Sequence, residues 1–335
     1  MAVTLKDIAQ ATGLSISTVS RVASGKGYVS AEAREKAETA MTALGYEHRA
    51  QRRRFVSDSS EQVLIMIGGV RSSIAANLVE LLSEELFAKG KQPILGVTGF
   101  DPAHEVEYLN MAADRRFYGV ITLTITETPT VVRLLKHYPC PIVMLGRYLP
   151  MRRVDCLHAD YYKMGFDGAE YLIKHGHKRI AFVGATKTST ISQDKHTGFV
   201  DCMHSHGLEV RPDYDLYAKR LDYGDAKDVA QRILEMRERP TALLSSNDIS
   251  VGILDRLLAE GLKVPEELSI FSCEDSPMVK HCQVPMTAME VDYQQMCIDA
   301  VRTLGRRRRH PDEAYVRMYY DPTIIERKSV CSLIA

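Results

Sequence analysis

Hydrophobic and polar positions divide this chain of 335 residues into two parts. Up to about residue 45, apolar positions recur every three or four residues, which predicts short amphipathic helices. Beyond residue 60, short apolar runs bounded by turn residues alternate with longer segments of helical spacing. The pattern therefore predicts a small helical unit followed by a larger α/β unit.

The first two helices are framed by residues that begin and end helices. Thr4 and Asp7 have the spacing of a capping box, with Asp in place of the usual Glu or Gln. Gly13 supplies the permissive backbone that ends the first helix, and Ser15 can cap the second. Two short helices across a tight turn are typical of a helix-turn-helix.

The second helix has an outer face that is short, polar and lightly charged. Val19 and Val22 are predicted to face inward, whereas Ile16, Ser17 and Arg21 face outward. Such a face suits base edges and phosphates better than it suits solvation alone. The alternative is a small helical cap with a solvated basic face, but the turn, the caps and the outward residues together favour DNA reading.

A third helix is predicted after Ser30, a candidate cap, and Gly45 is its candidate C-terminal stop. Its expected inner face is formed by Ala37, Ala40, Met41 and Leu44. Three helices of this size bury little surface, so we expect this unit to need a partner for stability.

Charge is unevenly distributed along the chain. Residues 1–55 carry nine Lys or Arg and five Asp or Glu, whereas the whole chain carries 43 of each and is formally neutral. A neutral chain with a basic end is typical of a DNA reader attached to another function. Residues 49–60 break the periodic pattern and are predicted to form a linker whose basic half can fold on DNA.

Strand-like and helix-like segments follow one another from residue 63 onward. The expected strands are 63–67, 93–97, 119–123, 141–145, 180–184, 242–245 and 270–273. The expected helices are 76–89, 105–115, 130–137, 163–175, 193–206, 226–236, 249–260 and 294–304. This alternation predicts parallel sheets in doubly wound domains, which bind ligands beyond the carboxyl ends of their strands.

Composition narrows the functional classes. The length exceeds that of one average domain, and a hydrophobic content of 45% is ample for packed cores. No run reaches the roughly 18 apolar residues that a membrane span needs, and the N-terminus reads as the helical unit rather than a signal peptide. We therefore expect a cytoplasmic protein with no membrane partner.

The cysteines and the absence of catalytic motifs argue against disulfides, metal sites and enzymatic activity. The seven scattered cysteines form no Cys-x-x-Cys pair, which favours reduced, mostly buried thiols over a disulfide framework or a zinc site. They are Cys140, Cys156, Cys202, Cys273, Cys282, Cys297 and Cys331. The sequence has no glycine-rich phosphate loop, nucleophile elbow or metal-spaced His cluster, so we expect no enzymatic activity, cofactor or metal.

Seven short motifs carry a family resemblance. They are Thr4-Leu-Lys-Asp-Ile-Ala, Ser17-Thr-Val-Ser-Arg, Val29-Ser, Thr42-Ala-Leu-Gly-Tyr46, Gly176-His-Lys-Arg-Ile180, Ser246-Asn-Asp248 and Gly261-Leu-Lys-Val-Pro265. With them, the chain resembles the lac repressor and galactose repressor family of bacterial transcription regulators over nearly its whole length. The N-terminal motifs are the most specific.

The resemblance implies an all-α helix-turn-helix headpiece, joined by a hinge to a two-lobed α/β core with parallel sheets, similar to periplasmic sugar-binding proteins. The expected extents are 1–48 for the headpiece, 49–60 for the hinge, 61–335 for the core, about 61–160 and 291–321 for its N-lobe, and about 161–290 and 322–330 for its C-lobe. The chain is expected to cross between the lobes near Asp160, Glu290 and Asp321. Homodimers or larger assemblies that bind a palindromic operator are implied.

The same resemblance places Ile16, Ser17 and Arg21 at positions that select the base sequence. Positions at or near contacts with the DNA backbone are Thr18, Ser20 and Tyr46. Arg21 can reach a guanine or a phosphate, and Ile16 can meet a thymine methyl group. The alternative for Ile16 is packing against the first helix.

The hinge departs from the family pattern. Typical members have Tyr-x-Pro-Asn and then Ala-Arg-x-Leu, whose leucine wedges into the minor groove. This chain has Tyr46-Glu-His-Arg49 and then Arg52-Arg53-Arg54-Phe55, so Arg53 matches the arginine and Phe55 replaces the leucine. Phenylalanine can also pry apart a base step, but Arg52 in place of alanine argues against close packing of two hinges. The alternative is a flexible basic tether that grips phosphates.

Four loci match sugar-contacting positions of the family. They are Arg71, Lys195 where an arginine is usual, Asn247 with Asp248, and Glu274 where an aspartate is usual. Charged and amide groups at strand ends can bond sugar hydroxyls or pair with an anionic ligand. Asn247 and Asp248 can instead cap the helix that follows them. The changes at Lys195 and Glu274 argue against a common neutral monosaccharide.

Two further charged features have a structural alternative. Arg147 follows the strand expected at 141–145 and is a weaker candidate for effector binding, equally compatible with a surface charge. The run 306–309, four consecutive arginines, is expected to be a solvated cluster after a helix, with a second DNA contact as the alternative.

The sequence therefore predicts a sequence-specific DNA-binding transcriptional regulator, a repressor controlled by a sugar or sugar derivative bound between its lobes. One alternative is a co-repressor-dependent regulator that binds a purine or another non-sugar metabolite. Another is a solute-binding protein without a regulatory role, which would have a signal peptide and no headpiece. A sequence-blind DNA binder would not need a core of roughly 270 residues. The expected partners are pseudo-palindromic double-stranded operator DNA, a small-molecule effector and a second copy of the chain.

Overall fold

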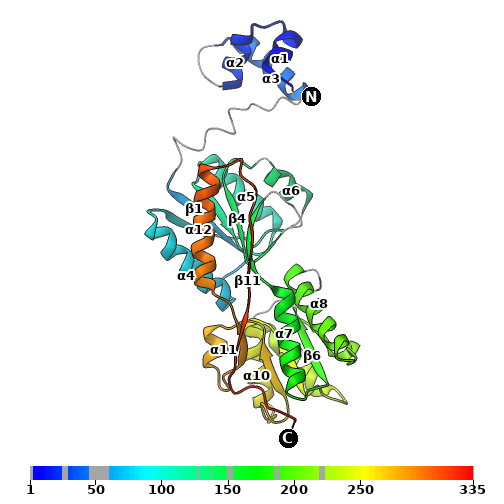
Figure 1. Cartoon of the computed structure of the whole chain (residues 1–335). Helices are drawn as coiled ribbons and strands as arrows, with labels where there is room; N and C mark the ends of the chain where they lie inside the picture. Colours follow the sequence, from blue (N-terminus) through cyan, green and yellow to red (C-terminus); the bar gives the residue numbers. More distant parts are fainter. Residues whose placement is uncertain are drawn as a thin grey trace.

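The computed structural model describes residues 3–24, 29–44, 60–126, 128–136, 138–148, 154–184, 187, 189–218 and 223–334. These residues form a three-helix headpiece and two α/β lobes built on parallel sheets, which confirms the predicted fold class (Figure 1). Within these ranges, no helix has the length and hydrophobicity that crossing a membrane requires.

The headpiece consists of α1 (Leu5–Thr12), α2 (Ile16–Ser24) and α3 (Ala31–Leu44). The predicted capping box is confirmed, because the Thr4 backbone N–H donates to Asp7 Oδ2 at 2.8 Å and the Asp7 N–H donates to Thr4 Oγ1 at 3.4 Å. Gly13 ends α1 in the left-handed region at φ 69°, which favours glycine. Ser15 Oγ accepts from the Thr18 N–H at 3.1 Å and so caps α2 as predicted.

The hydrophobic core of the headpiece is small. Ile8, Ala9 and Val19 are buried against one another, with Ala40 and Met41 of α3 packed on them. The prediction that Leu44 belongs to the inner face is wrong, because this side chain is 42% exposed. Leu44 is the last residue of α3, beyond the turn of that helix that packs on α1 and α2.

The N-lobe is built on a six-stranded sheet in the order β11-β5-β4-β3-β1-β2, with all neighbouring strands parallel. Its strands are β1 (Gln62–Ile67), β2 (Gln92–Val97), β3 (Gly119–Thr122), β4 (Ile142–Leu145), β5 (Asp155–Ala159) and β11 (Arg317–Tyr320). Its helices are α4 (Ser73–Ala88), α5 (Pro102–Asp114), α6 (Pro129–Lys136) and α12 (Tyr293–Arg309). Apolar side chains of α4 and α12 cover one face of the sheet, and those of α5 and α6 cover the other.

The C-lobe repeats this architecture with the order β12-β10-β9-β8-β6-β7, in which only the β10–β12 pair is antiparallel among the described strands. Its strands are β6 (Ile180–Gly184), β7 (Asp215–Tyr217), β8 (Ala242–Ser245), β9 (Ser269–Ser272), β10 (Thr287–Glu290) and β12 (Thr323–Ile325). Its helices are α7 (Tyr161–Lys174), α8 (Thr190–Ser205), α9 (Ala226–Glu235), α10 (Asn247–Ala259) and α11 (Pro277–His281), with 3₁₀ turns at Pro212–Tyr214 and Tyr223–Asp225. Helices α7 and α8 cover one face, and α9 and α10 the other.

The chain passes between the two lobes three times. It leaves the N-lobe after β5, returns between β10 and α12, and leaves again between β11 and β12 (Figure 1). The crossing points expected from the sequence, Asp160, Glu290 and Asp321, lie at or next to these connections. Each sheet therefore contains strands from the beginning and the end of the core.

The alternation of strands and helices agrees with the sequence pattern, although the ends of the elements differ by a few residues. The pattern missed the elements β5, β7, α11, β10, β11 and β12. Most of these are edge strands or short elements. Strand β5 has the sequence Asp-Cys-Leu-His-Ala, and its polar side chains are buried together with its apolar ones. Hydrophobic periodicity alone does not reveal such segments.

The arginine run at 306–309 is not the solvated cluster that the sequence predicts. Helix α12 continues through it, and Arg307 and Arg308 are buried. Arg307 donates through Nε and Nη2 to both oxygens of Asp155, at 2.8 and 3.0 Å. Arg308 donates to the Tyr118 carbonyl at 2.7 Å. These partners lie more than 150 residues away in the sequence, which is why the run resembles a surface cluster when read locally.

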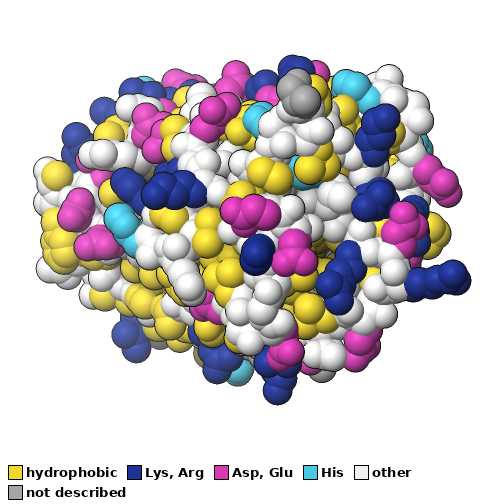
Figure 2. Space-filling model, turned by 90° about the horizontal axis from the view of Figure 1, so that it is seen from below, with side chains coloured by type: hydrophobic (Ala, Val, Ile, Leu, Met, Phe, Trp, Pro, Cys, Tyr) yellow, Lys and Arg dark blue, Asp and Glu magenta, His cyan; other side chains and the backbone are white. Residues whose placement is uncertain are grey.

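Other surface features are ordinary. Viewed from the C-lobe end, Lys and Arg side chains are interspersed with Asp and Glu (Figure 2), so this face carries no broad field of one sign.

All seven cysteines are free thiols, and five of them are buried. Burial raises the pKa of the Cys140 thiol to about 11 and that of Cys297 to about 12, which disfavours the reactive thiolate.

Candidate functional site

The outer face of α2 presents the residues that the sequence singled out. Ile16 is 52% exposed, and Ser17 and Arg21 are also exposed, whereas Val19 and Val22 are buried. Ile16 therefore does not pack into the headpiece core. The cap is part of the same surface, because Ser15 Oγ lies 2.8 Å from Ser17 Oγ and from Thr18 Oγ1, while Ser20 is half-buried. The predicted DNA-contacting residues of the hinge, Tyr46, Arg49, Arg52, Arg53 and Phe55, lie outside the described residues.

A second candidate site lies where the carboxyl ends of the strands in the two sheets face each other. Hydrogen bonds link the lobes directly there: the Ser73 N–H donates to Asp248 Oδ2 at 2.7 Å, and the Tyr148 hydroxyl donates to Asp194 Oδ2 at 3.0 Å. The Tyr161 hydroxyl, on the first residue of α7, donates to the Gly146 carbonyl at 2.6 Å. We call this region the interlobe junction. It is the place at which doubly wound domains bind ligands.

Asp248 connects the two lobes. Its carboxylate is 1% exposed and accepts from the backbone N–H and hydroxyl of Ser73 in the N-lobe and from Ser276 Oγ in the C-lobe, the last at 3.2 Å. Ser72, at the N-cap position of α4, makes no side-chain cap bond. The Asp248 carboxylate takes that role from the opposite lobe, where the positive end of the helix dipole favours an anion.

Lys195 and Glu274 form a buried ion pair. They are 1% and 5% exposed, and the Lys195 ammonium donates to Glu274 Oε1 and, at 3.2 Å, to Ser246 Oγ. The ammonium also lies 5.4 Å from the centre of the Tyr161 ring. Two residues that the sequence placed at the effector site are thus brought together, with their charges compensated by each other.

Aromatic residues that the sequence analysis did not single out complete the junction. His158 is buried, stacks on Tyr148 with ring centres 5.0 Å apart, and meets the ring of Tyr319 edge-on at 4.6 Å. Its Nε2 has no hydrogen-bond partner among the described residues, and burial lowers the pKa of the imidazole. Burial, followed by the hydrogen bond to Asp194, raises the pKa of Tyr148 to about 12. Recognising β5 as a strand would have placed His158 at a strand end.

Each of the three other predicted effector residues follows a strand. Arg71 is exposed in the segment between β1 and α4. Asn247 begins α10, but its side chain lies outside what the structure describes. Arg147 follows β4 and is half-buried, and burial lowers the pKa of its guanidinium.

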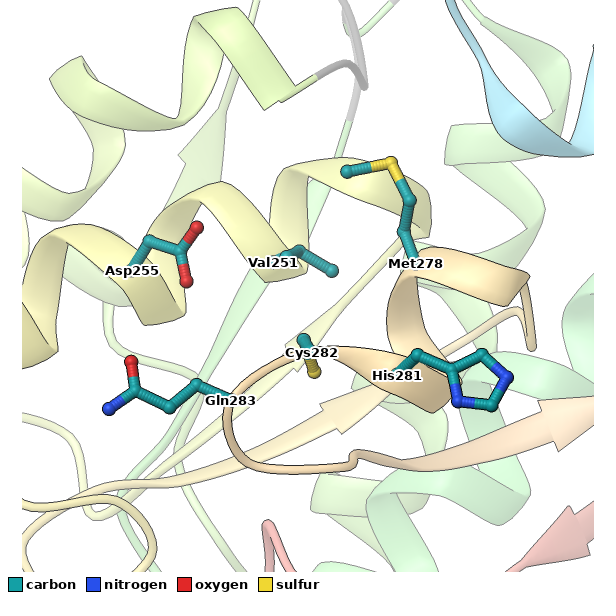
Figure 3. Close-up of a pocket in the computed structure, with 6 residues that line it drawn as sticks. All are labelled: Val251, Asp255, Met278, His281, Cys282 and Gln283. Carbon is teal, nitrogen blue, oxygen red and sulfur yellow. The ribbon is translucent and has the colours of Figure 1, made fainter.

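A separate pocket of about 290 Å³ lies on the C-lobe between α10 and α11. Its lining residues are Val251, Asp255, Met278, His281, Cys282 and Gln283 (Figure 3). Asp255 and His281 lie on opposite sides of Cys282 in this view, so the titratable groups do not converge on one point. Asp255 already accepts from the Tyr223 hydroxyl at 2.8 Å. Within the described residues, no group of three or more His, Cys, Asp or Glu is arranged to hold a metal ion.

Comparison with known proteins covers both parts of the chain. Residues 4–48 match the family described as bacterial regulatory proteins, lacI family, and residues 169–330 match the periplasmic binding protein-like domain. The HTH-type transcriptional repressor PurR of Haemophilus influenzae is 26% identical, over 99% of this chain and 99% of its own length.

Two solved structures share the fold over almost the whole chain. The complex of the transcriptional regulator CelR with cellobiose superposes with a TM-score of 0.75 and 22% identity, covering 98% of this chain and 99% of CelR. The lac repressor dimer bound to operator and the anti-inducer ONPF superposes with a TM-score of 0.73 and 18% identity, covering 99% of this chain and 100% of that repressor chain.

Proposed function

We propose that this chain, whose residues 4–48 match the lacI family of bacterial regulatory proteins, is a repressor whose affinity for a pseudo-palindromic operator is set by a sugar or sugar derivative at the interlobe junction. Members of this family are DNA-binding regulators of transcription rather than enzymes, and this chain is such a regulator with an effector-binding core. The observation that carries the proposed control is the bonding of Asp248 across the lobes, because it couples the junction to the placement of the lobes.

Operator reading is assigned to the outer face of α2. Replacing the exposed Arg21 with alanine should weaken operator binding by about 1–3 kcal/mol if the guanidinium contacts a base edge. Arg34→Ala, on the exposed side of α3, is the matched control and should bind almost normally. Gel-shift titration of folded proteins measures both. Equal operator binding by Arg21→Ala and wild type would refute the assignment.

A second copy of the chain is proposed to pack against the exposed apolar residues of the edge strand β2 and of α11. Leu95 and Val97 alternate along β2 and are exposed, and Met278 is exposed on α11. Strand β2 is the outermost strand of its sheet, and α4 and α11 lie on the same side of the molecule in Figure 1. Unpaired apolar edge strands are otherwise an aggregation hazard.

The double variant Leu95→Asp, Val97→Asp tests this dimer. It should shift sedimentation toward the monomer and weaken operator binding, because two half-sites are then no longer read together. The control Leu333→Asp changes an exposed leucine in the C-terminal segment and should leave both properties unchanged. Retention of the dimer by the double variant would show that another surface pairs the copies.

Effector control is proposed to work by a shift between two arrangements of the lobes. A ligand that binds one arrangement of the lobes more tightly than the other shifts their populations, and coupling of about 1–3 kcal/mol is common for such switches. Polar atoms without partners in the described part of the chain lie near the carboxyl ends of strands, including His158 Nε2 and Ser245 Oγ. Such groups suit a ligand rich in hydroxyls.

A thermal-shift screen of sugars, sugar phosphates and nucleobases tests the proposal, since a ligand that binds only the folded state raises its melting temperature. The operator titration is then repeated with each hit. Weaker operator binding supports induction by a sugar, whereas tighter binding with a nucleobase supports the co-repressor alternative. A hit that leaves operator affinity unchanged would refute effector control.

A further inference from the structure

We infer that the effector is a polyhydroxylated molecule with one anionic group, a carboxylate or a phosphate, and that Arg147 binds this group. This inference rests on the proposed function, because it names the chemical class of the ligand at the same junction. Its basis is the bonding of the charged side chains there.

Arg147 differs from another predicted cation of the junction, Lys195, in its bonding. It follows Gly146 at the carboxyl end of β4, and its side chain is half-buried. Within the described part of the chain, the guanidinium has Tyr161 and Glu105 as electrostatic neighbours but no hydrogen-bond or ion-pair partner. The nearby Tyr161 hydroxyl is committed to the Gly146 carbonyl. By contrast, Lys195 has both Glu274 and Ser246 as partners.

The acidic groups around Arg147 are already occupied. Glu105 is the carboxylate with an electrostatic influence on Arg147, but it accepts from the Thr126 N–H at 2.7 Å and the Thr126 hydroxyl at 3.1 Å. Asp194 accepts from Tyr148, and Glu274 from Lys195. The protein therefore stabilises these carboxylates with other donors, and Arg147 has no dedicated acceptor among them.

The preferred ligand follows from the chemistry of guanidinium. Arginine presents a planar fork of N–H donors that matches the paired oxygens of a carboxylate or phosphate. Partial removal from water penalises the cation, and a neutral hydroxyl supplies a hydrogen bond without compensating the charge. The Tyr293 hydroxyl makes no hydrogen bond in the described structure, and burial, followed by the nearby Glu274 carboxylate, raises its pKa. This hydroxyl, with the Lys195–Glu274 pair, offers donors and acceptors for the uncharged hydroxyls of the ligand.

Matched ligands test the inference on the full-length protein. The panel pairs D-glucose with D-glucuronate and glucose 6-phosphate, and D-galactose with D-galacturonate and galactose 6-phosphate. Each is titrated calorimetrically at constant ionic strength into wild type, Arg147→Gln and the control Arg133→Gln, which changes an exposed arginine of α6 in the same lobe. Melting curves establish that each variant is folded.

At least one anionic member should bind wild type and Arg133→Gln, and its affinity for Arg147→Gln should fall on the order of 10- to 100-fold, as for the loss of hydrogen bonds to a charged group. Its neutral counterpart should bind far more weakly to wild type. The uronates and phosphates separate the two anionic groups. Equal binding of the neutral sugar, unchanged affinity in Arg147→Gln, or no binding by any anionic member would overturn the inference. An anion that binds through Arg147 without changing operator affinity would support the ligand class and refute the proposed function.

Discussion

The headpiece and the core are held together by interactions of different range. In the headpiece, the bonds that define α1 join Thr4 and Asp7, three residues apart, and the core is a few small apolar side chains. In the larger unit, each sheet is covered on both faces, and critical polar bonds join residues such as Asp155 and Arg307 that are 152 positions apart. The headpiece is therefore specified locally but weakly stabilised, whereas the core is stabilised by contacts that the local sequence does not reveal.

Ile8→Ala is expected to give the largest difference between its effect on the headpiece and its effect on the core. Ile8 is fully buried in the small headpiece core, and truncation of such a residue costs about 2–5 kcal/mol. This loss should unfold the headpiece and abolish operator binding, while the core keeps its melting temperature and its ligand affinity. Gel shift and calorimetry measure the two parts separately. A matching fall in the core's melting temperature would show that the regions are not independent.

Asp155→Ala should have the next largest effect, this time on the core. It leaves Arg307 buried without its carboxylate, and removal of one partner from a buried ion pair costs about 3–5 kcal/mol. We expect a much lower melting temperature for the core, measured by scanning calorimetry. Arg309→Gln, an exposed position of the same run, is the control and should melt like wild type. If both variants melt normally, the bond between Asp155 and Arg307 is not a main support of the N-lobe.

A smaller effect is expected from the bond between the lobes. Ser73→Ala and Asp248→Asn, alone and together, form a double-mutant cycle, and directly bonded residues show coupling of about 0.5–3 kcal/mol. The cycle is measured by urea unfolding, with small-angle scattering to follow the separation of the lobes. Additive effects of the two substitutions would mean that Asp248 does not hold the lobes together through the Ser73 hydroxyl.

The smallest effect concerns Asp7 in the headpiece. Hydrogen bonds from the Thr4 side chain and backbone lower the pKa of this carboxyl below its ordinary value of 3.8. The carboxylate therefore contributes stability that is fully present above pH 3.8 and is lost as the pH falls through the lower pKa of the folded state. Methyl NMR of Ile8 in the full chain should show the headpiece loosening in this acidic range, and Asp7→Asn should remove that pH dependence. An identical acid profile in Asp7→Asn would assign the transition to other groups.

Local signals explain why the headpiece was predictable. Thr4, Gly13 and Ser15 each act on backbone groups within three residues, so their roles are visible in the sequence alone. Parallel strands such as β1 and β6 were also predicted, because both of their faces are buried and their sequences are continuously apolar.

Remote partners explain what was missed. Strand β5 contains Asp155 and His158, whose burial is intelligible only once Arg307 and Tyr148 are beside them. Asp248 was expected at a ligand or at its own helix, and its main partner is Ser73, 175 residues earlier. The interlobe junction was located at strand ends from the pattern, but its bonding depended on contacts that no local pattern encodes.

The triple crossing between the lobes has a consequence for synthesis of the protein. Helix α12 and strand β11 complete the N-lobe, and β12 completes the C-lobe, so neither lobe is whole until residues beyond 290 have left the ribosome. The three helices of the headpiece, by contrast, all lie within the first 44 residues. A nascent chain therefore contains these helices long before it contains the complete unit that regulates them. Each new molecule becomes able to respond to its effector only at the end of translation.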